Sequence, residues 1–473
     1  KDKINLYSSY SFNNRYRNSI GYRRVYTIYD PVFSILPYIL PELTDSIDYD
    51  TDNETHKNNH KLRLGSDYYI NDQLVLNAEL NYSKHQKNSN NLQIINAPVE
   101  DAKTISTQEF DDDENFDFEG VLGLTKSYDN PDKEFSIFIN KDYEQDDESE
   151  VLDEVEWKDT TAFSELINLT EIDMSYKHPF TDDIKIEFGY DGLLNDNIED
   201  SEYQLTIADI IDDWDEENTY LDINHISGLN TFSYKRQIHG FFFETSIKFN
   251  DRWSIKNGLR YEHVNKDISF EKNPDTWYQR DYDPDNENYE NGLDYSSLEE
   301  CQLNYEGICN EVLTDGNIYT QLLDSTPSES YNTTYFNLYP SFHLTYNITE
   351  QKSIQFAITE RVERPGSGGH GGGSRQIRPF PRDIYTDQFI FIGNPFLEPE
   401  YSTQFELSYK SPIPMGFFYS NLYYHTIKNK VEWYDDDQFD DADVLTFRNA
   451  DTGKSYGLEL FVMVMGQTLG GGY

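Results

Sequence analysis

The sequence lacks the features of a helical membrane protein and of a nucleic-acid-binding protein. Its 473 residues include only two cysteines and four methionines. The longest apolar run is about PVFSILPYIL at 31–40, and two prolines interrupt it. Because a membrane helix needs about 20 apolar residues, a helical span is excluded. Basic residues are scarce too: 38 Lys and Arg face 87 Asp and Glu, a net charge of -49. This balance argues against nucleic acid, which is bound by basic surfaces.

Aromatic residues are abundant, with 38 tyrosines and 29 phenylalanines. A chain this acidic could be disordered, but disordered chains are poor in aromatic side chains. The combination therefore favours a folded, β-rich protein. Membrane-spanning β-strands remain possible, since half of their residues face away from lipid and hydropathy stays low.

Alternation of apolar and polar residues recurs along the chain. In GNPFLEPEYSTQFELSYK, at 393–410, a cluster of turn-forming residues leads into a segment where Phe405, Leu407 and Tyr409 alternate with polar residues. A period of two predicts a strand with one apolar face. The same pattern appears at 61–70, 73–83, 116–125, 184–190, 243–249, 252–261 and 336–348.

Tight and long connections alternate between these segments. Tight turns are predicted near 71, 131, 181, 250, 349 and 413, and long connections at about 15–60, 86–115, 141–160, 192–236, 264–332, 362–400 and 431–450. The long connections hold acidic runs such as FDDDENFD and KDYEQDDESEVLDEVEW. With this alternation all long connections emerge on one rim, as in outer-membrane barrels with short periplasmic turns and long extracellular loops. The sequence therefore predicts an all-β, antiparallel up-and-down transmembrane β-barrel, with about 14 strands of about ten to fifteen residues in this chain.

Four motifs follow one another from residue 353 to residue 461: SIQFAITERVERP, IGNPFLEPEYSTQFELSYK, GFFYSNLYYHTIKNKVEW and RNADTGKSYGLELF. Their order and spacing resemble the C-terminal half of a TonB-dependent receptor barrel, from the outer-membrane β-barrel family common in Bacteroidetes-type bacteria. HKLRLGSDYYINDQLVLNAELNY and KINLYSSYSFN are similar to early strands of that family. These motifs identify the family and are not expected to form a site. In them, Phe405, Leu407 and Tyr409 are expected to face lipid, Glu459 the lumen, and Gly457 to allow close backbone approach.

The resemblance implies a barrel of about 22 strands around a plug, in the bacterial outer membrane. It also implies contact with lipid and with the TonB complex, and neither a cofactor nor enzymatic activity. Because only about 14 strands and no plug or TonB-contact segment are evident, residues 1–473 are expected to form one partial barrel domain. The plug and the terminal strands are expected to lie outside this sequence.

Five arginines surround the glycine-rich tract GSGGHGGGS in this acidic chain: Arg361, Arg364, Arg375, Arg378 and Arg382. If this segment folds into the lumen, their guanidinium groups can bind a carboxylate or phosphate of a ligand bidentately. Alternatively, the arginines pair with acidic residues of other loops. The sequence leaves both possibilities open.

A second candidate site is acidic. DYDPDNENYEN places four carboxylates at alternate positions, a ligand set suited to calcium: Asp281, Asp283, Asp285 and Glu287. The stretch lacks the glycine and the final glutamate of an EF-hand loop. A solvated acidic surface is the alternative to a calcium site.

The only two cysteines, Cys301 and Cys309, lie close together in CQLNYEGIC. Their spacing allows a small disulfide loop, although two free thiols would fit the sequence as well. A disulfide would indicate an oxidising compartment.

Three functions remain open at this stage. The first is a TonB-dependent transporter that binds a ligand through long extracellular loops and imports it. The second is a structural barrel subunit that docks a surface lipoprotein or other outer-membrane subunits without energised transport. The third is a secreted all-β adhesin or glycan-binding domain.

Overall fold

The computed structural model describes residues 3–28, 43–96, 104–153, 157–213, 218–281, 308–311, 329–366, 376–379, 389–414, 416–435 and 443–464. They form a single sheet of 16 strands. The strands are β1 (Ile4–Ile28), β2 (Leu43–Asn71), β3 (Leu74–Asn96), β4 (Thr104–Ser127), β5 (Glu134–Asp153), β6 (Trp157–Pro179), β7 (Ile184–Asp213), β8 (Asn218–Lys248), β9 (Trp253–Asp281), β10 (Ile308–Glu311), β11 (Glu329–Asn347), β12 (Ser353–Glu363), β13 (Phe389–Phe391), β14 (Glu400–Ile413), β15 (Gly416–Asp435) and β16 (Asp443–Val464). Among the described residues, no helix is long and apolar enough to cross a membrane.

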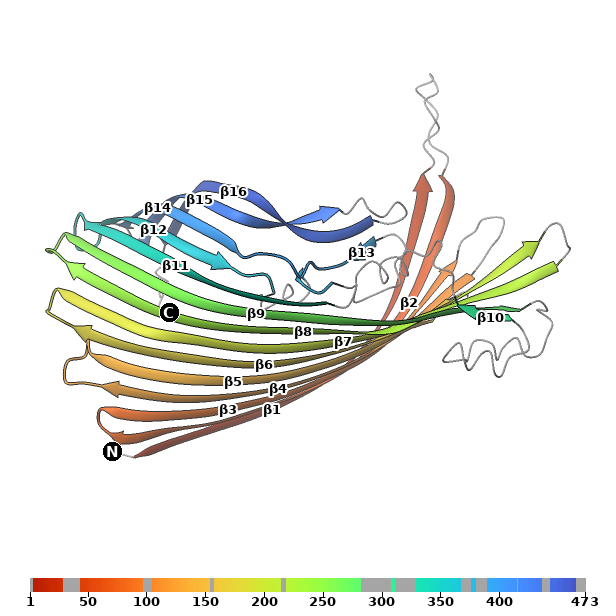
Figure 1. Ribbon diagram of the computed structural model, residues 1–473, viewed down its shortest axis with the longest axis horizontal. Coiled ribbons are helices and arrows are strands. Elements are labelled where there is room, and N and C mark those ends of the chain that lie inside the picture. The colour runs from red at the N-terminus through yellow and green to blue at the C-terminus, as the bar shows by residue number, and fades with distance from the viewer. Residues whose placement is uncertain are drawn as a thin grey trace, which may run out of the picture.

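Each long strand pairs antiparallel with its neighbours in the chain, in the order β1 to β9, β11, β12, β14, β15, β16. The two short strands are additions at the rim: β10 pairs antiparallel with β9, and β13 pairs parallel with β16. Without them, 14 long strands remain. This confirms the predicted all-β, antiparallel up-and-down fold and its strand count. Figure 1 shows the sheet curving so that β11 to β16 turn back over the wall made by β6 to β9.

The tight turns gather at one end of the sheet, at the left of Figure 1. Several are closed by side chains that accept a backbone hydrogen bond two residues later. Asn71, Asn130 and Asn250 accept from the backbone N–H of Gln73, Asp132 and Arg252 at 2.9, 3.0 and 2.9 Å. Asparagine favours this turn geometry, so the turns were recognisable in the sequence. The long breaks in the described residues, such as those after β1, β3 and β9, begin at the opposite ends of the strands.

Most strands are longer than the sequence predicted. They reach 30 residues in β7 and 31 in β8. The prediction of a long connection at 192–236 is therefore wrong, because most of these residues belong to the two strands. β7 and β8 are paired from Ile184↔Ile247 to Asp213↔Asn218. A tilted strand crosses lipid with about 9–11 residues, so the parts of β7 and β8 far from the turns extend beyond the membrane. There the outward-facing Glu202 is exposed, while the inward-facing Glu199 and Ser201 are polar yet buried. The apolar alternation that marks a strand is therefore lost.

The acidic runs lie on strands as well. FDDDENFD belongs to β4, and most of KDYEQDDESEVLDEVEW belongs to β5. The register places Asp111 opposite Glu150 and Asp113 opposite Glu148. Directly opposed like charges destabilise a strand pair. Asp111 is partly compensated by Lys87 and Ser89 on β3, at 3.5 and 2.5 Å.

The strand of the 393–410 stretch, β14, shows how the two faces of the sheet differ. Leu407 pairs with Phe356 and Leu422, and it is 46% exposed on the outer face, as expected for contact with lipid. On the inner face, an added Cβ at Gly457 would lie 2.6 Å from the hydroxyl of Tyr423. The close neighbour of Gly457 is thus a side chain, and the predicted close approach of backbone at Gly457 stays a prediction.

Gly189 provides a test of packing between β6, β7 and β8. An added Cβ would lie 2.2 Å from the backbone oxygen of Met174 and 2.5 Å from the ring of Phe242. Because a backbone oxygen cannot move aside easily, Gly189→Ala should lower the unfolding free energy by about 1–3 kcal/mol. Urea unfolding in detergent, followed by tryptophan fluorescence, measures this loss. In the control Gly120→Ala the nearest atom lies at 3.9 Å, so equal losses in both variants would contradict the prediction.

Candidate functional site in the barrel lumen

Part of the chain between β12 and β14 lies against the inner face of the sheet. We call residues 364–366, 376–379 and 389–399 the inner segment. Two of its side chains, Ile377 and Leu397, are each only 1% exposed. They belong to a buried apolar cluster that joins β8, β9 and β16: Phe232, Tyr234, Ile268, Phe270, Ile377, Leu397 and Phe447. The inner segment therefore links strands that are far apart in the order of the sheet.

The asparagine of the GNPFLEPE motif fixes the shape of the inner segment. Its side-chain oxygen accepts from the backbone N–H of Phe396 at 2.9 Å, and its Nδ2 donates to the backbone oxygen of Phe447 at 3.0 Å. The backbone N–H of Asn394 also donates to the oxygen of Gln376 at 2.8 Å. Asn394 thus holds two parts of the inner segment together and attaches them to β16.

The two glutamates of the same motif tie the segment to β15 and β16. Glu398 Oε2 accepts from Asn429 at 2.9 Å, and Glu400 Oε1 accepts from the backbone N–H of Val431 at 2.6 Å. Asn449 exchanges two hydrogen bonds with the backbone of Glu398, at 2.9 and 3.0 Å. Asn429 has a φ of 54°, a conformation that asparagine tolerates better than most residues. The motif thus holds the inner segment in a fixed position against β15 and β16.

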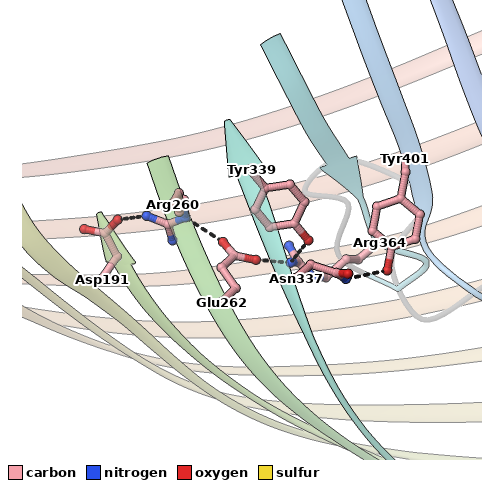
Figure 2. Close-up of polar contacts among 7 residues, drawn as sticks. All are labelled: Asp191, Arg260, Glu262, Asn337, Tyr339, Arg364 and Tyr401. Carbon is pink, nitrogen blue, oxygen red and sulfur yellow. Dashed lines mark hydrogen bonds and ion pairs between the residues drawn. The ribbon is translucent and has the colours of Figure 1, made fainter. Parts of the chain in front are cut away.

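A chain of charged and polar groups runs along the inner face from β7 to β14 (Figure 2). Glu262 on β9 lies between two arginines: Arg260 Nε donates to it at 2.6 Å, and Arg364 donates from the inner segment. Arg260 also forms an ion pair with Asp191 on β7. At the other end of this network, Asn337 donates to the hydroxyl of Tyr401 at 2.8 Å. The hydroxyl of Tyr339 lies 3.5 Å from Arg364 Nη2. Four strands and the inner segment are connected by this network.

A second ion pair joins the inner segment to β7. Arg378 Nη1 lies 2.9 Å from Glu199 Oε2, and these side chains are 7% and 0% exposed. The guanidinium also lies 5.5 Å from the ring centre of Phe163 on β6. A buried pair of this kind is costly to break, since the remaining buried charge loses an ion-pair contact that water does not replace.

Next to this pair, Glu165 on β6 lies opposite Glu199 in the register. Glu165 accepts a hydrogen bond from Asn197 at 2.8 Å, and it lies farther from the tight turn than the part of β6 needed to cross lipid. Burial first, and then the negative charge of Glu199, raise the pKa of the Glu165 carboxyl to about 7. Glu165 is therefore a carboxyl group that takes up a proton near neutral pH.

This shift predicts a pH dependence of stability. The folded protein holds the Glu165 proton up to about pH 7, and the unfolded chain loses it near the ordinary value of 4.5. Stability from this group is therefore greatest at low pH and falls as pH rises from about 4.5 through 7, by at most about 3 kcal/mol. Urea unfolding at pH 5 and pH 8 should show that Glu165→Gln removes this part of the dependence. Asp182→Asn, at an exposed carboxyl in a turn, should retain it; identical profiles for Glu165→Gln and the unmodified protein would refute the assignment.

The structure brings together only part of the predicted arginine cluster. Arg364 and Arg378 lie on the inner segment and pair with Glu262 and Glu199, while Arg361 on β12 is exposed. Arg375 and Arg382 lie outside the described residues. Ligand binding by these five arginines stays a prediction.

The other predicted sites fall mostly outside the described residues. Asp283, Asp285 and Glu287 lie there entirely, and for Asp281, which ends β9, only the backbone is described. Cys301 also lies outside, and Cys309 belongs to β10. The calcium site and the disulfide therefore stay predictions.

The sequence analysis missed the acidic partners of the arginines, Glu199 and Glu262, and also the buried cation Arg236 on β8. All three occupy polar positions of alternating strands and face inward. Alternation could therefore have marked them as lumen-facing. It could not have paired Glu199 with Arg378, which is 179 residues away.

A family model described as "Outer membrane protein beta-barrel family" matches residues 122–286 and 314–466. The chain belongs to this family. The protein is therefore located in the outer membrane, as predicted, and the expectation that it is not an enzyme is confirmed. A comparison with curated proteins finds no match.

Among solved structures, this outer-membrane barrel is similar to two receptors. One is a double mutant of the Serratia marcescens hemophore receptor HasR in complex with its hemophore HasA and heme. The sequence identity is 13% and the TM-score is 0.42, and the match covers 89% of this chain and 56% of that chain. The other is the siderophore receptor PiuA from Acinetobacter baumannii. Here the sequence identity is 11% and the TM-score is 0.41, and the match covers 89% of this chain and 60% of that chain. The chain spans less than two thirds of either structure.

Proposed function

We propose that this chain is the barrel portion of a TonB-dependent outer-membrane transporter, which binds a ligand from outside the cell and imports it. In this proposal, residues 1–473 contribute part of a barrel of about 22 strands around a plug, and the TonB complex supplies the energy. The observation that supports it is the inner segment. This segment is held against the inner wall by ion pairs such as Arg378–Glu199, and it places groups that a ligand could contact inside the barrel.

The inner segment also offers groups that a ligand could contact. Phe396 is 54% exposed, and its ring lies 5.6 Å from that of Tyr331 on β11, in an edge-on arrangement. Lys266 lies 5.6 Å from the Tyr331 ring. Exposed aromatic rings beside a cation suit a ligand with both apolar and anionic parts. Arg361, exposed on β12, provides a further cation.

Uptake measurements test the transport proposal. Cells that lack this protein should lose uptake of one or more scarce nutrients, and the gene should restore it. Uptake should also stop when TonB is deleted or when a protonophore collapses the proton-motive force. Uptake at the normal rate without TonB, or no uptake defect across a nutrient panel, would argue against energised import.

A second function, docking of partner proteins, is favoured by the length of the strands. β7, β8 and β9 remain paired as far as Asp213↔Asn218 and Leu221↔Asp281, well beyond the lipid. A rigid sheet of this kind offers a platform for a surface lipoprotein or another outer-membrane subunit. Shortening the β7–β8 hairpin should then release a co-purifying partner and leave the barrel intact. Isolation of the unmodified protein without stable partners would favour transport instead.

A further inference from the structure

The inner face of β8 and β9 carries two neighbouring cations. Arg236 on β8 lies opposite Lys266 on β9 in the register, and Arg236 is only 5% exposed. Among the described residues, no carboxylate forms an ion pair with either side chain. Burial first, and then the charge of Arg236, lower the pKa of the Lys266 ammonium, and the negative charge of Glu398 only partly opposes this. Lys266 lies outside the lipid-crossing part of β9. The chain has 87 acidic residues, so the buried Arg236, without an ion pair among the described residues and next to the half-buried Lys266, requires an explanation.

The polar atoms around these cations lack partners too. Arg236 Nε and Nη1, Tyr234 Oη, Asn195 Oδ1 and Thr333 Oγ1 are all buried without a hydrogen bond. They are neighbours: Asn195 on β7 lies opposite Arg236, and Thr333 on β11 lies opposite Lys266. The Tyr234 ring lies 5.5 Å from the Arg236 guanidinium. Buried polar atoms are nearly always satisfied by protein, water or a bound ion.

We propose that Arg236 and Lys266 form a binding site for a small anion, a carboxylate or phosphate group, on the inner face of the barrel. The planar guanidinium can donate two parallel hydrogen bonds to such a group, and the ammonium adds a point charge. The hydroxyl groups of Tyr234 and Thr333 supply further donors.

This site differs from the arginine cluster that the sequence indicated. Arg364 and Arg378 form ion pairs with Glu262 and Glu199, whereas Arg236 forms none with the carboxylates that the structure describes. Lys266 Nζ also donates to the backbone oxygen of Leu397 at 3.3 Å. A bound anion would therefore lie next to an attachment point of the inner segment and would stabilise it. The proposal does not depend on transport, since a docking barrel could hold the same anion.

Titration with inorganic phosphate and with acetate, at constant ionic strength set with sodium chloride, tests the site. With the full chain in detergent, the midpoint of thermal unfolding should rise in a saturable way with either anion. Arg236→Gln and Lys266→Gln should each weaken the apparent affinity by about tenfold or more. Arg236→Lys should retain part of the response, since it keeps the charge. The neighbouring Lys235 pairs with Asp196 at 3.2 Å and is 52% exposed, so Lys235→Gln is a matched control and should respond like the unmodified protein.

Two results would overturn the proposal: no saturable shift in the unmodified protein, or an equal shift in Arg236→Gln. If the variants do not fold, the unmodified protein still decides the question. Crystals soaked in sodium selenate, an oxyanion with an anomalous signal, should show a peak within hydrogen-bonding distance of Arg236 Nη1. Ordinary water density at that position, without an anomalous peak, would rule the site out.

Discussion

Glu199→Gln should lower the free energy of unfolding by about 3–5 kcal/mol, because it removes the carboxylate that faces the buried guanidinium of Arg378. The two groups are 2.9 Å apart, and their side chains are 0% and 7% exposed. Urea unfolding in detergent measures the loss. Hydrogen exchange at residues 376–379 should increase in the same variant, since the ion pair holds this part of the inner segment on β7.

Two controls separate this effect from a general sensitivity of β7. Glu202, three residues farther along the strand, is exposed, and Glu202→Gln should change the unfolding free energy by less than about 0.5 kcal/mol. Replacing both partners, as Glu199→Leu with Arg378→Met, should recover much of the loss, since no buried charge then remains. A loss in the double variant as large as in Glu199→Gln would show that the ion pair is not the cause.

Glu262→Gln should have a comparably large effect, about 3–5 kcal/mol, because one carboxylate serves two arginines. Glu262 is 5% exposed and accepts from both Arg260 and Arg364. The loss should exceed that of Arg364→Ala, which leaves the Arg260–Glu262 contact in place. The unfolding free energies of both single variants, measured under the same conditions, show which variant loses more stability.

The comparison for this prediction is an ion pair that is more exposed to solvent. Glu244 lies 2.6 Å from Lys256, with side chains 31% and 52% exposed. Exposed pairs contribute at most about 1 kcal/mol, so Glu244→Gln should be nearly neutral. Equal effects of Glu244→Gln and Glu262→Gln would mean that burial does not determine the strength of these contacts.

The sequence was sufficient for the architecture because each tight turn determines the register of its hairpin. The turn at 249–252 places Arg236 opposite Lys266, a pair that counting outward from the turn would have found. Lipid-facing residues such as Leu407 were visible from alternation alone. The strand ends were not, since the outer parts of β4 and β5 are polar on both faces and resemble loops.

The contacts of the candidate site were harder to predict. Arg364 and Arg378 belong to a group of arginines that is unusual in an acidic chain. Their partners, however, are determined by how the inner segment lies across the curved sheet. Local patterns carry no information about such long-range pairs. The GNPFLEPE motif was interpreted as a marker of the family, and its asparagine and glutamates turned out to anchor the inner segment.

The short parallel strand β13 has a consequence for the assembly of the barrel. It covers the free side of β16 only at Asp443 to Leu445. Another strand joining that side of β16 could pair with the backbone beyond Phe447, as far as Val464, because the oxygen of Phe447 already accepts from Asn394. It would have to stop short of the position that β13 occupies. The length over which such a strand could pair with β16 would therefore be limited by β13, a strand of only three residues that never crosses the bilayer.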